Sequence, residues 1–496
     1  MIAPKPTFAV IGAVNHGKSS VVSTLSEDDE VRVSPMPGET VEVKQFRLSD
    51  LLTFYDTPGF QNARKALAEI QSAAAPPDPL ARFRAFVDRH QGDPEFDAEC
   101  RLLQPILAGA GVIYVVDGSL PVTDLHRCEV ELVRLTAAPR LAIVNRTAGR
   151  DHVDEWRAVL AQTFNAVREF NAHWASFEDR KDLLEALANI ERAWKPQLQK
   201  AVAALESDRR SRVADAAAIV TGLLETALGF SKRQAIEAED AGAPGSAAVE
   251  LQASFKADMA AMEAKAHDAM IGLFAHRLVQ SPGQSKDMFG HSLFSEETWR
   301  LLGLSGDQLL AAGAVAGGLA GAGVDALTAG HTLLAGTAIG AAVGAGGAFL
   351  LGKKQPDISV SLRTASLPKA MRMLLPNKLR LSANEVVVGP LKAVNFPWIL
   401  IDRALCTLVY VAGRAHGRRD AAQVKVDELQ PWLAEQRLTV EHWPEADRKR
   451  CERAFAALRK SGGAPGDEAR LLPEIIERHL NEVVEAASGA ARPTPL

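Results

Sequence analysis

The chain has 496 residues, which is too long for one ordinary hydrophobic core, so two or three domains are expected. Hydrophobic residues make up 47% of it and charged residues 24%, a composition that excludes an intrinsically disordered chain. The formal net charge of -5 excludes a global attraction to nucleic acid or anionic lipid, so any such contact has to be local.

The cysteines and the first residues bear on the cellular compartment. The four cysteines lie far apart and form no CxxC pair, so neither a zinc site nor a disulfide framework is expected, and a reducing cytosol fits best. Residues 1–7 carry Lys5 and two prolines and run directly into an apolar segment, which leaves no room for a cleavable signal peptide. We therefore expect a cytoplasmic N-terminus.

A phosphate-binding loop follows the first predicted strand, residues 7–11. Residues 12–19 read GAVNHGKS and satisfy the pattern GxxxxGK[ST], and a helix should begin at Ser19. Such a loop wraps backbone amides around the phosphates of a nucleotide, while Lys18 bridges the β- and γ-phosphates and Ser19 offers its hydroxyl to Mg²⁺. The other predicted binding residues of this loop are Gly12, Asn15, His16, Gly17 and Ser20.

A second motif ends the strand predicted over residues 51–55. Residues 56–59 read DTPG, the DxxG pattern that places the carboxylate of Asp56 beside the metal, and Gly59 completes it. Between the two motifs, PGET ends at Thr40 and precedes an alternating strand, so Thr40 is positioned to sense Mg²⁺ and the γ-phosphate. The predicted catalytic residues are Lys18, Thr40, Asp56 and Gly59, and the predicted metal ligands are Ser19, Thr40 and Asp56.

Two more buried strands are predicted over residues 111–117 and 140–145. The second leads into NRTA, which resembles the guanine-reading motif NKxD of the translation-factor-like GTPases: Asn145 is kept, Arg146 replaces lysine and Ala148 replaces the base-reading aspartate. The missing carboxylate weakens selectivity for guanine over adenine unless Asp151 or another group substitutes, and GTP remains the better expectation. Ser176, in the run ASF, lies where the final SAx motif of that family would stand.

The order of these motifs, with the PGET and DTPGF runs, resembles the Era/TrmE-like branch of bacterial GTPases. The NHGKSS loop, the NRTA variant and the long carboxyl half look like a bacterial P-loop GTPase family whose C-terminal region is a domain of unknown function. The resemblance implies GTP or GDP and Mg²⁺ as ligands and a guanine nucleotide as partner.

Hydrolysis should be slow. Phe60 occupies the position directly after DxxG, where many GTPases carry the glutamine that orients the attacking water, and Gln61 lies one residue further on. The resemblance implies that a homodimer, a potassium ion or a protein partner positions the water instead. Asn15 stands where potassium-activated members carry an asparagine, and K⁺ binding and a simple loop cap remain two open interpretations.

Residues 61–110 exceed a minimal switch segment and contain a helix-like stretch at 80–90. We interpret them as a loop plus helix against the nucleotide face, either a partner surface or a solvated decoration. Apolar stripes at helical spacing over residues 183–198 and 251–270 predict helices, with a flexible linker at 240–246. Packing within a bundle, a partner groove and a coiled-coil dimer are the alternatives for these stripes.

Residues 308–352 are rich in glycine and alanine, and Asp325 is their only formally charged residue. Glycines recur at four-residue intervals on both sides of Asp325, which predicts a helical hairpin with closely approaching backbones. Each arm would reach roughly 25 to 30 Å, near the thickness of a bilayer core. Arg300 before the hairpin and Lys353 and Lys354 after it fit two cytoplasmic ends. Contact with inner-membrane lipid and burial in a soluble module are both open.

The remaining chain predicts short strands at 358–362 and 379–388 and then helices, with a basic cluster at 413–419 that fits phospholipid or RNA phosphates or a solvated helix end. The predicted fold is an α/β P-loop G domain with a mostly parallel sheet, followed by a mainly α-helical region with a glycine-zipper hairpin and a small α+β part. The predicted domains are the G domain at 1–205, a helical stalk or bundle at 206–300, the hairpin at 301–354 and the C-terminal domain at 355–496.

Taken together, the motifs and the resemblance predict a GTP-binding, slowly hydrolysing molecular switch in the cytoplasm, at the inner membrane. One alternative is a nucleotide-binding structural or interaction protein with negligible hydrolysis. The other is a soluble GTPase that acts on RNA or the ribosome.

Overall fold

The computed structural model describes residues 5–26, 44–48, 51–72, 76–146, 151–172, 175–236, 244–274, 292–304, 308, 360–364, 384–413 and 426–488. The predicted switch residue Thr40, the base-motif residue Ala148, the hairpin beyond Gln308 and the basic cluster beyond Gly413 lie outside these ranges.

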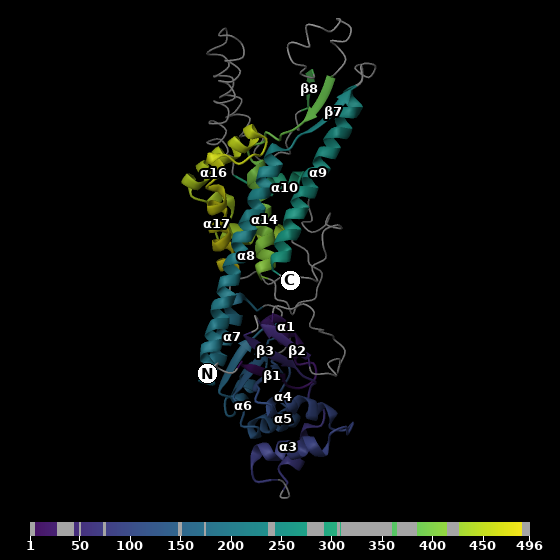
Figure 1. Ribbon diagram of the computed structural model, residues 1–496, viewed down its shortest axis with the longest axis vertical. Helices are drawn as coiled ribbons and strands as arrows, with labels where there is room; N and C mark the ends of the chain where they lie inside the picture. Colours follow the sequence, from purple (N-terminus) through teal and green to yellow (C-terminus); the bar gives the residue numbers. More distant parts are fainter. Residues whose placement is uncertain are drawn as a thin grey trace.

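A six-stranded sheet forms the centre of the N-terminal domain (Figure 1). Its strands are β1 (Thr7–Ile11), β2 (Lys44–Leu48), β3 (Leu52–Asp56), β4 (Gly111–Asp117), β5 (Arg140–Asn145) and β6 (Ala166–Phe170). Their order is β2-β3-β1-β4-β5-β6, and all pairs are parallel except β2 with β3. The carboxyl ends of the parallel strands therefore meet at one edge, where Val10 pairs with Asp56 and Asp117 pairs with Asn145.

Both faces of this sheet are covered by helices, as the continuous apolar strands predict. In β4, Val112, Tyr114 and Val116 pack into one hydrophobic cluster and Ile113 and Val115 into the other, because successive side chains point to opposite faces. The first cluster holds α2 (Ala63–Ile70), α3 (Pro79–Arg89), α4 (Asp97–Leu107), α5 (Asp124–Leu135) and α6 (Val153–Leu160). The second holds α1 (Lys18–Ser26) and α7 (Phe177–Ala188). The predicted α/β P-loop fold is confirmed.

The segment over residues 61–110 is a packed part of the domain. It forms three helices, α2, α3 and α4, and Phe83, Phe86 and Phe96 are buried in the same hydrophobic cluster as Ala9 of β1. The interpretation as a solvated decoration is therefore wrong for these helices, because three large aromatic side chains are removed from water.

A single long helix, α8 (Lys195–Gly229), joins the two halves of the molecule (Figure 1). Leu198 and Leu205 belong to a core of the N-terminal domain, whereas residues from Val213 to Leu228 belong to the core of the C-terminal half. The domain boundary predicted after residue 205 falls inside this helix. The apolar stripe over 183–198 is divided between two helices, since α7 ends at Ala188 and α8 begins at Lys195.

The C-terminal half is built around one hydrophobic cluster that draws on residues 213–304 and 386–487. The regions that we treated as a stalk and a C-terminal domain thus share a core. Its helices are α9 (Pro244–Leu273), α10 (Glu296–Leu301), α14 (Phe396–Gly413), α15 (Val426–Glu435), α16 (Glu445–Ser461) and α17 (Leu472–Ser488), with 3-10 turns at η4 (Val440–His442) and η5 (Asp467–Ala469). An antiparallel sheet has the order β7 (Lys232–Ile236), β9 (Asn384–Val388), β8 (Val360–Thr364). The stripe of α9, including Phe255 and Met259, is buried in this core, which confirms the bundle interpretation.

Helix α14 is, in the described part of the chain, the one helix whose length and composition would let it cross a bilayer. Its 18 residues have a mean hydropathy of 1.4, but 83% of them are buried inside the protein. A core helix passes the same test, and Arg403 of α14 forms a buried ion pair with Glu263 of α9 at 2.5 Å. This helix is therefore weak evidence for a membrane span.

Candidate nucleotide-binding site

The loop after β1 has a backbone that requires glycine at two positions. Gly12 has a φ of 145° and Gly17 one of 85°. A Cβ atom on Gly12 would lie 2.2 Å from the carbonyl oxygen of Val115, and one on Gly17 would lie 2.3 Å from Nδ2 of Asn145. Close approach and positive φ both exclude a side chain, so the two glycines of the motif set the shape of the loop.

Lys18 begins α1 and is buried under the loop. Its Nζ donates a hydrogen bond to the carbonyl oxygen of Ala13 at 2.8 Å. Burial lowers the pKa of Lys18 to about 8, and the carboxylates of Asp56 and Glu129 oppose that shift. A cation held away from water in this way is stabilised by an anionic ligand, which is the role that the motif gives to this side chain.

Ser19 and Asp56 meet beside Lys18. The Ser19 hydroxyl donates to Oδ2 of Asp56 at 2.7 Å, and the carboxylate is buried. Burial raises the pKa of Asp56, while the Ser19 hydrogen bond and the charges of Lys18 and Lys44 lower it. The Oδ1 atom of Asp56 is buried and makes no hydrogen bond within the described part of the chain. A hydroxyl and a carboxylate with an unused oxygen fit Mg²⁺, so these two residues would hold the ion.

The DxxG motif lies directly against the phosphate-binding loop. Phe60 donates its backbone N–H to the carbonyl oxygen of Gly12 at 3.3 Å and forms an isolated parallel bridge with Ala13. A Cβ atom on Gly59 would lie 2.7 Å from the backbone nitrogen of Val14, so only glycine fits there. The Phe60 ring is buried in the domain core. The position that holds glutamine in many GTPases therefore offers no side chain to a water molecule here.

Asn145 at the end of β5 connects two loops. Its Nδ2 donates to the carbonyl oxygen of His16 at 3.4 Å, and its Oδ1 accepts the backbone N–H of Ala172 at 3.2 Å. The side chain is buried. Asn145 thus fixes the phosphate-binding loop to the loop that follows β6.

Arg146 is exposed at the same edge of the sheet. Its guanidinium contacts Glu169 at 3.2 Å and Asp151 at 3.4 Å. Asp151 also accepts the backbone N–H of Val153 at 3.0 Å, at the start of α6. The carboxylate that sequence reasoning offered as a substitute base reader lies beside the arginine of the motif.

Ser176 is engaged as a helix cap. Its Oγ accepts the backbone N–H of Asp179 at 3.1 Å and donates to the carboxylate of the same residue at 2.7 Å, in a capping box that opens α7. The residue that contacts Asn145 is Ala172, earlier in the chain than the predicted SAx position. Sequence reasoning missed Ala172, which follows the short and partly exposed strand β6.

His16 is buried under the loop and does not face solvent. Its Nδ1 accepts the backbone N–H of Asp117 at 3.1 Å, and its ring packs on the rings of His126 and Trp156, with centroids 5.1 and 6.4 Å away. Burial lowers the pKa of His16 to about 4, and the neighbouring His126 and Lys18 add to that shift. His16 is therefore neutral at physiological pH and supports the loop.

Two buried glutamates near the loop had no signal in the sequence. Glu129 of α5 accepts a hydrogen bond of 2.8 Å from the hydroxyl of Tyr114, and burial raises its pKa to about 7. Glu99 of α4 accepts the backbone N–H groups of Gln61 and Asn62. Both carboxylates belong to helices, α4 and α5, that pack in the same hydrophobic cluster as α2, the helix that follows DxxG.

Two protein families match this chain. Residues 7–99 match the 50S ribosome-binding GTPase family, and residues 157–475 match a domain of unknown function, DUF3482. The second match begins inside α6, so it includes β6 and α7 of the G domain as well as the C-terminal half.

Several relatives carry the name "Probable GTP-binding protein EngB". The protein from Ligilactobacillus salivarius is 26% identical over 174 residues, which cover 31% of this chain and 86% of that protein. The proteins from Bacillus cytotoxicus and Pediococcus pentosaceus are each 37% identical over 65 residues, which cover 13% of this chain and 33% of theirs. The chain thus spans about a third of the length of these last two relatives.

These matches agree with the geometry of the site. The N-terminal part is a GTP-binding GTPase domain with a P-loop, and the type of domain implies GTP or GDP and Mg²⁺ as its ligands. The relatives are named EngB, a related but distinct family, so they do not support the narrower Era/TrmE-like assignment. With more than half of its residues matched, the chain belongs to the DUF3482 family and carries a P-loop GTPase domain on its N-terminal side.

Proposed function

We propose that this protein binds GTP with Mg²⁺, hydrolyses it slowly and acts as a molecular switch. The observation that carries the proposal is the 2.7 Å hydrogen bond between Ser19 and Asp56, which brings the two motifs together beside Lys18. A phosphate-binding loop and a metal-binding carboxylate account for the buried lysine and for the Asp56 oxygen that has no hydrogen-bond partner in the described part of the chain.

Each motif would contact a different part of the bound nucleotide. The loop amides and Lys18 hold the phosphates, and Ser19 with Asp56 holds the ion, which neutralises charge on the phosphates when bound. Gly59 packs against Val14, so the DxxG backbone is close to where the terminal phosphate sits. Because the Phe60 ring is buried, this chain supplies no side chain directly after DxxG to orient water, and slow turnover follows.

The test is a turnover and binding measurement on the purified protein. We expect GTP turnover well below about 1 s⁻¹, in the range of unassisted GTPases. Lys18→Ala should abolish nucleotide binding while the protein keeps its fold, and Lys195→Ala, which removes an exposed lysine, serves as the control. Unchanged affinity in Lys18→Ala would reject the site. GTP binding without turnover would favour the structural or interaction protein.

A narrower proposal concerns the membrane. We propose that residues 308–352 attach the protein to the inner membrane, on the evidence of their sequence, in which Asp325 is the only formal charge. Membrane and soluble fractions should be compared for the full chain and for a deletion of 308–352, followed by a carbonate wash. Retention of only the full chain in washed membranes supports the proposal. If both are soluble, attachment fails, and steep salt-dependent RNA affinity would then favour the RNA or ribosome alternative.

A further inference from the structure

The backbone that follows the DxxG motif is held by a carboxylate from helix α4. Oε1 of Glu99 accepts the backbone N–H of Gln61 at 2.7 Å and that of Asn62 at 2.6 Å. Glu99 is completely buried, with 0% of its surface exposed. Hydrogen bonds to an ionised carboxylate are roughly twice as strong as neutral ones, so this contact is a firm one.

The two donors lie at the start of α2, the helix that follows the switch motif. Asn62 is the N-cap residue of α2, but its own side chain makes no capping hydrogen bond. The Asn62 side chain instead donates to the carbonyl oxygen of Glu95 at 2.6 Å. Glu99 therefore accepts the N–H of the N-cap residue, which is the role that the third helical residue has in a capping box.

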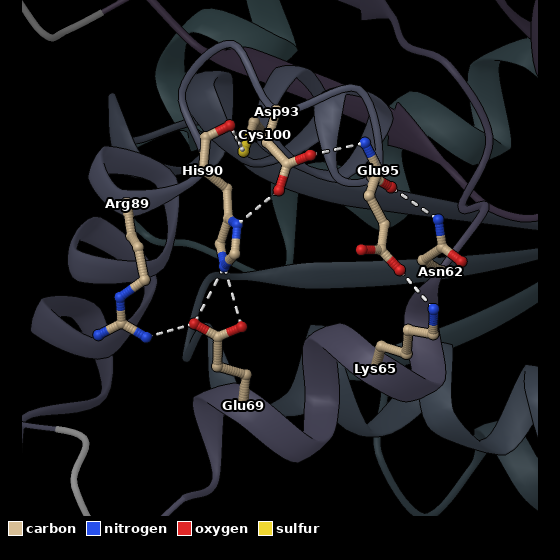
Figure 2. Close-up of polar contacts among 8 residues, drawn as sticks. All are labelled: Asn62, Lys65, Glu69, Arg89, His90, Asp93, Glu95 and Cys100. Atoms are coloured by element: carbon tan, nitrogen blue, oxygen red, sulfur yellow. Dashed lines mark hydrogen bonds and ion pairs between the residues drawn. The ribbon is translucent and has the colours of Figure 1, made fainter.

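Further contacts connect α2 to the same α3–α4 unit (Figure 2). Lys65 pairs with the carboxylate of Glu95, and Glu69 contacts Nε2 of His90 at 2.9 Å. His90 also contacts Asp93 at 3.1 Å through its other ring nitrogen. Polar contacts thus fasten the first and last turns of α2 to a segment that lies up to 38 residues away in the chain.

On the opposite side, the same stretch of backbone contacts the phosphate-binding loop. Gly59 packs against Val14, and Phe60 bonds to Gly12. The four residues from Gly59 to Asn62 are therefore held between the loop and Glu99. Glu99 therefore contacts the same short stretch of backbone that packs against the phosphate-binding loop.

The arrangement has an energetic cost. Oε2 of Glu99 is buried and has no hydrogen-bond partner among the described residues. A buried carboxylate with an oxygen that lacks a partner is costly. A serine or threonine at Asn62 would not replace Glu99, because an N-cap side chain accepts the N–H groups of the second and third helical residues and not those of Gln61 and Asn62. The two charge-assisted hydrogen bonds offset that cost only while the backbone after DxxG stays in place.

We propose that Glu99 is a positioning residue for the backbone that follows DxxG. By holding Gln61 and Asn62, it keeps the Gly59 peptide at the place where the γ-phosphate of GTP binds. The contact between α2 and α4 would then differ between the GTP-bound and the GDP-bound protein. This inference rests on the proposed function. It adds a residue outside the sequence motifs that favours the GTP-bound state.

The test compares the affinity of purified full-length variants for GDP and for a non-hydrolysable GTP analogue. Glu99→Ala should weaken binding of the analogue about tenfold, the loss expected for one charge-assisted contact, and change GDP affinity by no more than about twofold. Glu99→Asp, whose shorter side chain does not reach the two N–H groups, should behave like Glu99→Ala. Glu99→Gln keeps an oxygen acceptor and should restore most of the analogue affinity.

The matched control is Asp97→Ala, which removes an exposed carboxylate from the same helix turn and pairs only with Arg101 among the described residues. Equal losses for both nucleotides, or no loss, would overturn the proposal, since a merely structural role does not distinguish them. If Glu99→Ala does not fold, hydrogen exchange of the Gln61 and Asn62 amides in the unaltered protein decides: slower exchange with the analogue than with GDP supports it, and equal exchange overturns it. An unaltered protein that binds neither nucleotide refutes the proposed function instead.

Discussion

At the scale of single residues, Asn15 is the clearest open question in the site. It occupies the left-handed region with a φ of 65°, and it is exposed at the phosphate-binding loop. Asparagine tolerates this backbone better than most residues, so conformation alone would explain its presence. Its side-chain oxygen is also a suitable ligand for a monovalent cation. The two interpretations, a loop cap and a potassium site, therefore give the side-chain oxygen of Asn15 different roles, which can be tested.

We propose that turnover is faster in K⁺ than in Na⁺ by at least about tenfold, which corresponds to about 1.4 kcal/mol in the activation free energy. Asn15→Gly keeps the left-handed backbone and removes the amide oxygen, so this variant should lose the preference for K⁺ while it still binds GDP. The measurement is GTP turnover in matched K⁺ and Na⁺ buffers. Equal rates for the unaltered protein would rule out the potassium site and leave the loop cap.

At the scale of elements, the contact of α5 with β4 contains a titratable group. Glu129 of α5 is buried against Tyr114 of β4, and Lys18 and Glu99 lie close enough to influence its charge. Burial raises its pKa from 4.5 to about 7, and the charge of Lys18 and the Tyr114 hydrogen bond oppose that rise. The folded protein thus binds more protons than the unfolded chain between these two values. The contribution of protonated Glu129 to the free energy of unfolding is fully present below about pH 4.5 and is lost as the pH rises through 7.

The variant Glu129→Gln should remove this pH dependence, because an amide stays neutral. The unaltered protein should therefore be less stable than the variant by about 3 kcal/mol above pH 7, and the difference should shrink toward pH 5. Thermal unfolding of both proteins across this range measures it. Parallel stability curves would show that Glu129 titrates normally. Glu131→Gln, at a partly exposed position of the same helix, is the control.

At the scale of the whole molecule, α8 is the element that both cores share. Its 35 residues contribute to the G-domain core before residue 206 and to the C-terminal core from Val213 onward. Helix α7, which opens close to the nucleotide loops, also packs along it. Helix α8 is therefore a continuous element that connects the G domain to the C-terminal half and could transmit a change at the nucleotide site. Whether it does so depends on the integrity of the helix between the two cores.

Ser207→Pro places a helix breaker at an exposed position between the two cores, whereas Ser207→Ala preserves the helix. Proline in a helix interior costs about 3 kcal/mol or more, so the variant should kink α8 there. We expect its calorimetric unfolding to separate into two transitions, of which GDP stabilises one, with GDP affinity unchanged. A single transition like that of Ser207→Ala would show that the two halves are coupled by contacts other than α8.

The sequence by itself determined the parts of the protein whose signals are local. The strands at 7–11, 111–117 and 140–145 occur where the apolar runs predicted them, and the loop glycines, Lys18, Ser19, Asp56 and Asn145 meet at the edge that their strands imply. Each of these predictions needs only a strand of known direction and a motif at its end. Thr40 lies outside the described residues, and its role stays a prediction.

Only the tertiary structure decided the burial of Glu99 and Glu129 and the shared core of the C-terminal half. A glutamate in a helix reads as a solvated residue, and nothing in its neighbours shows that another element will cover it. The contact of Glu99 with Gln61 spans 38 residues of chain, and residues 213–304 find their core partners after residue 386. Burial and pairing of this kind depend on how distant segments pack, which a local pattern does not contain.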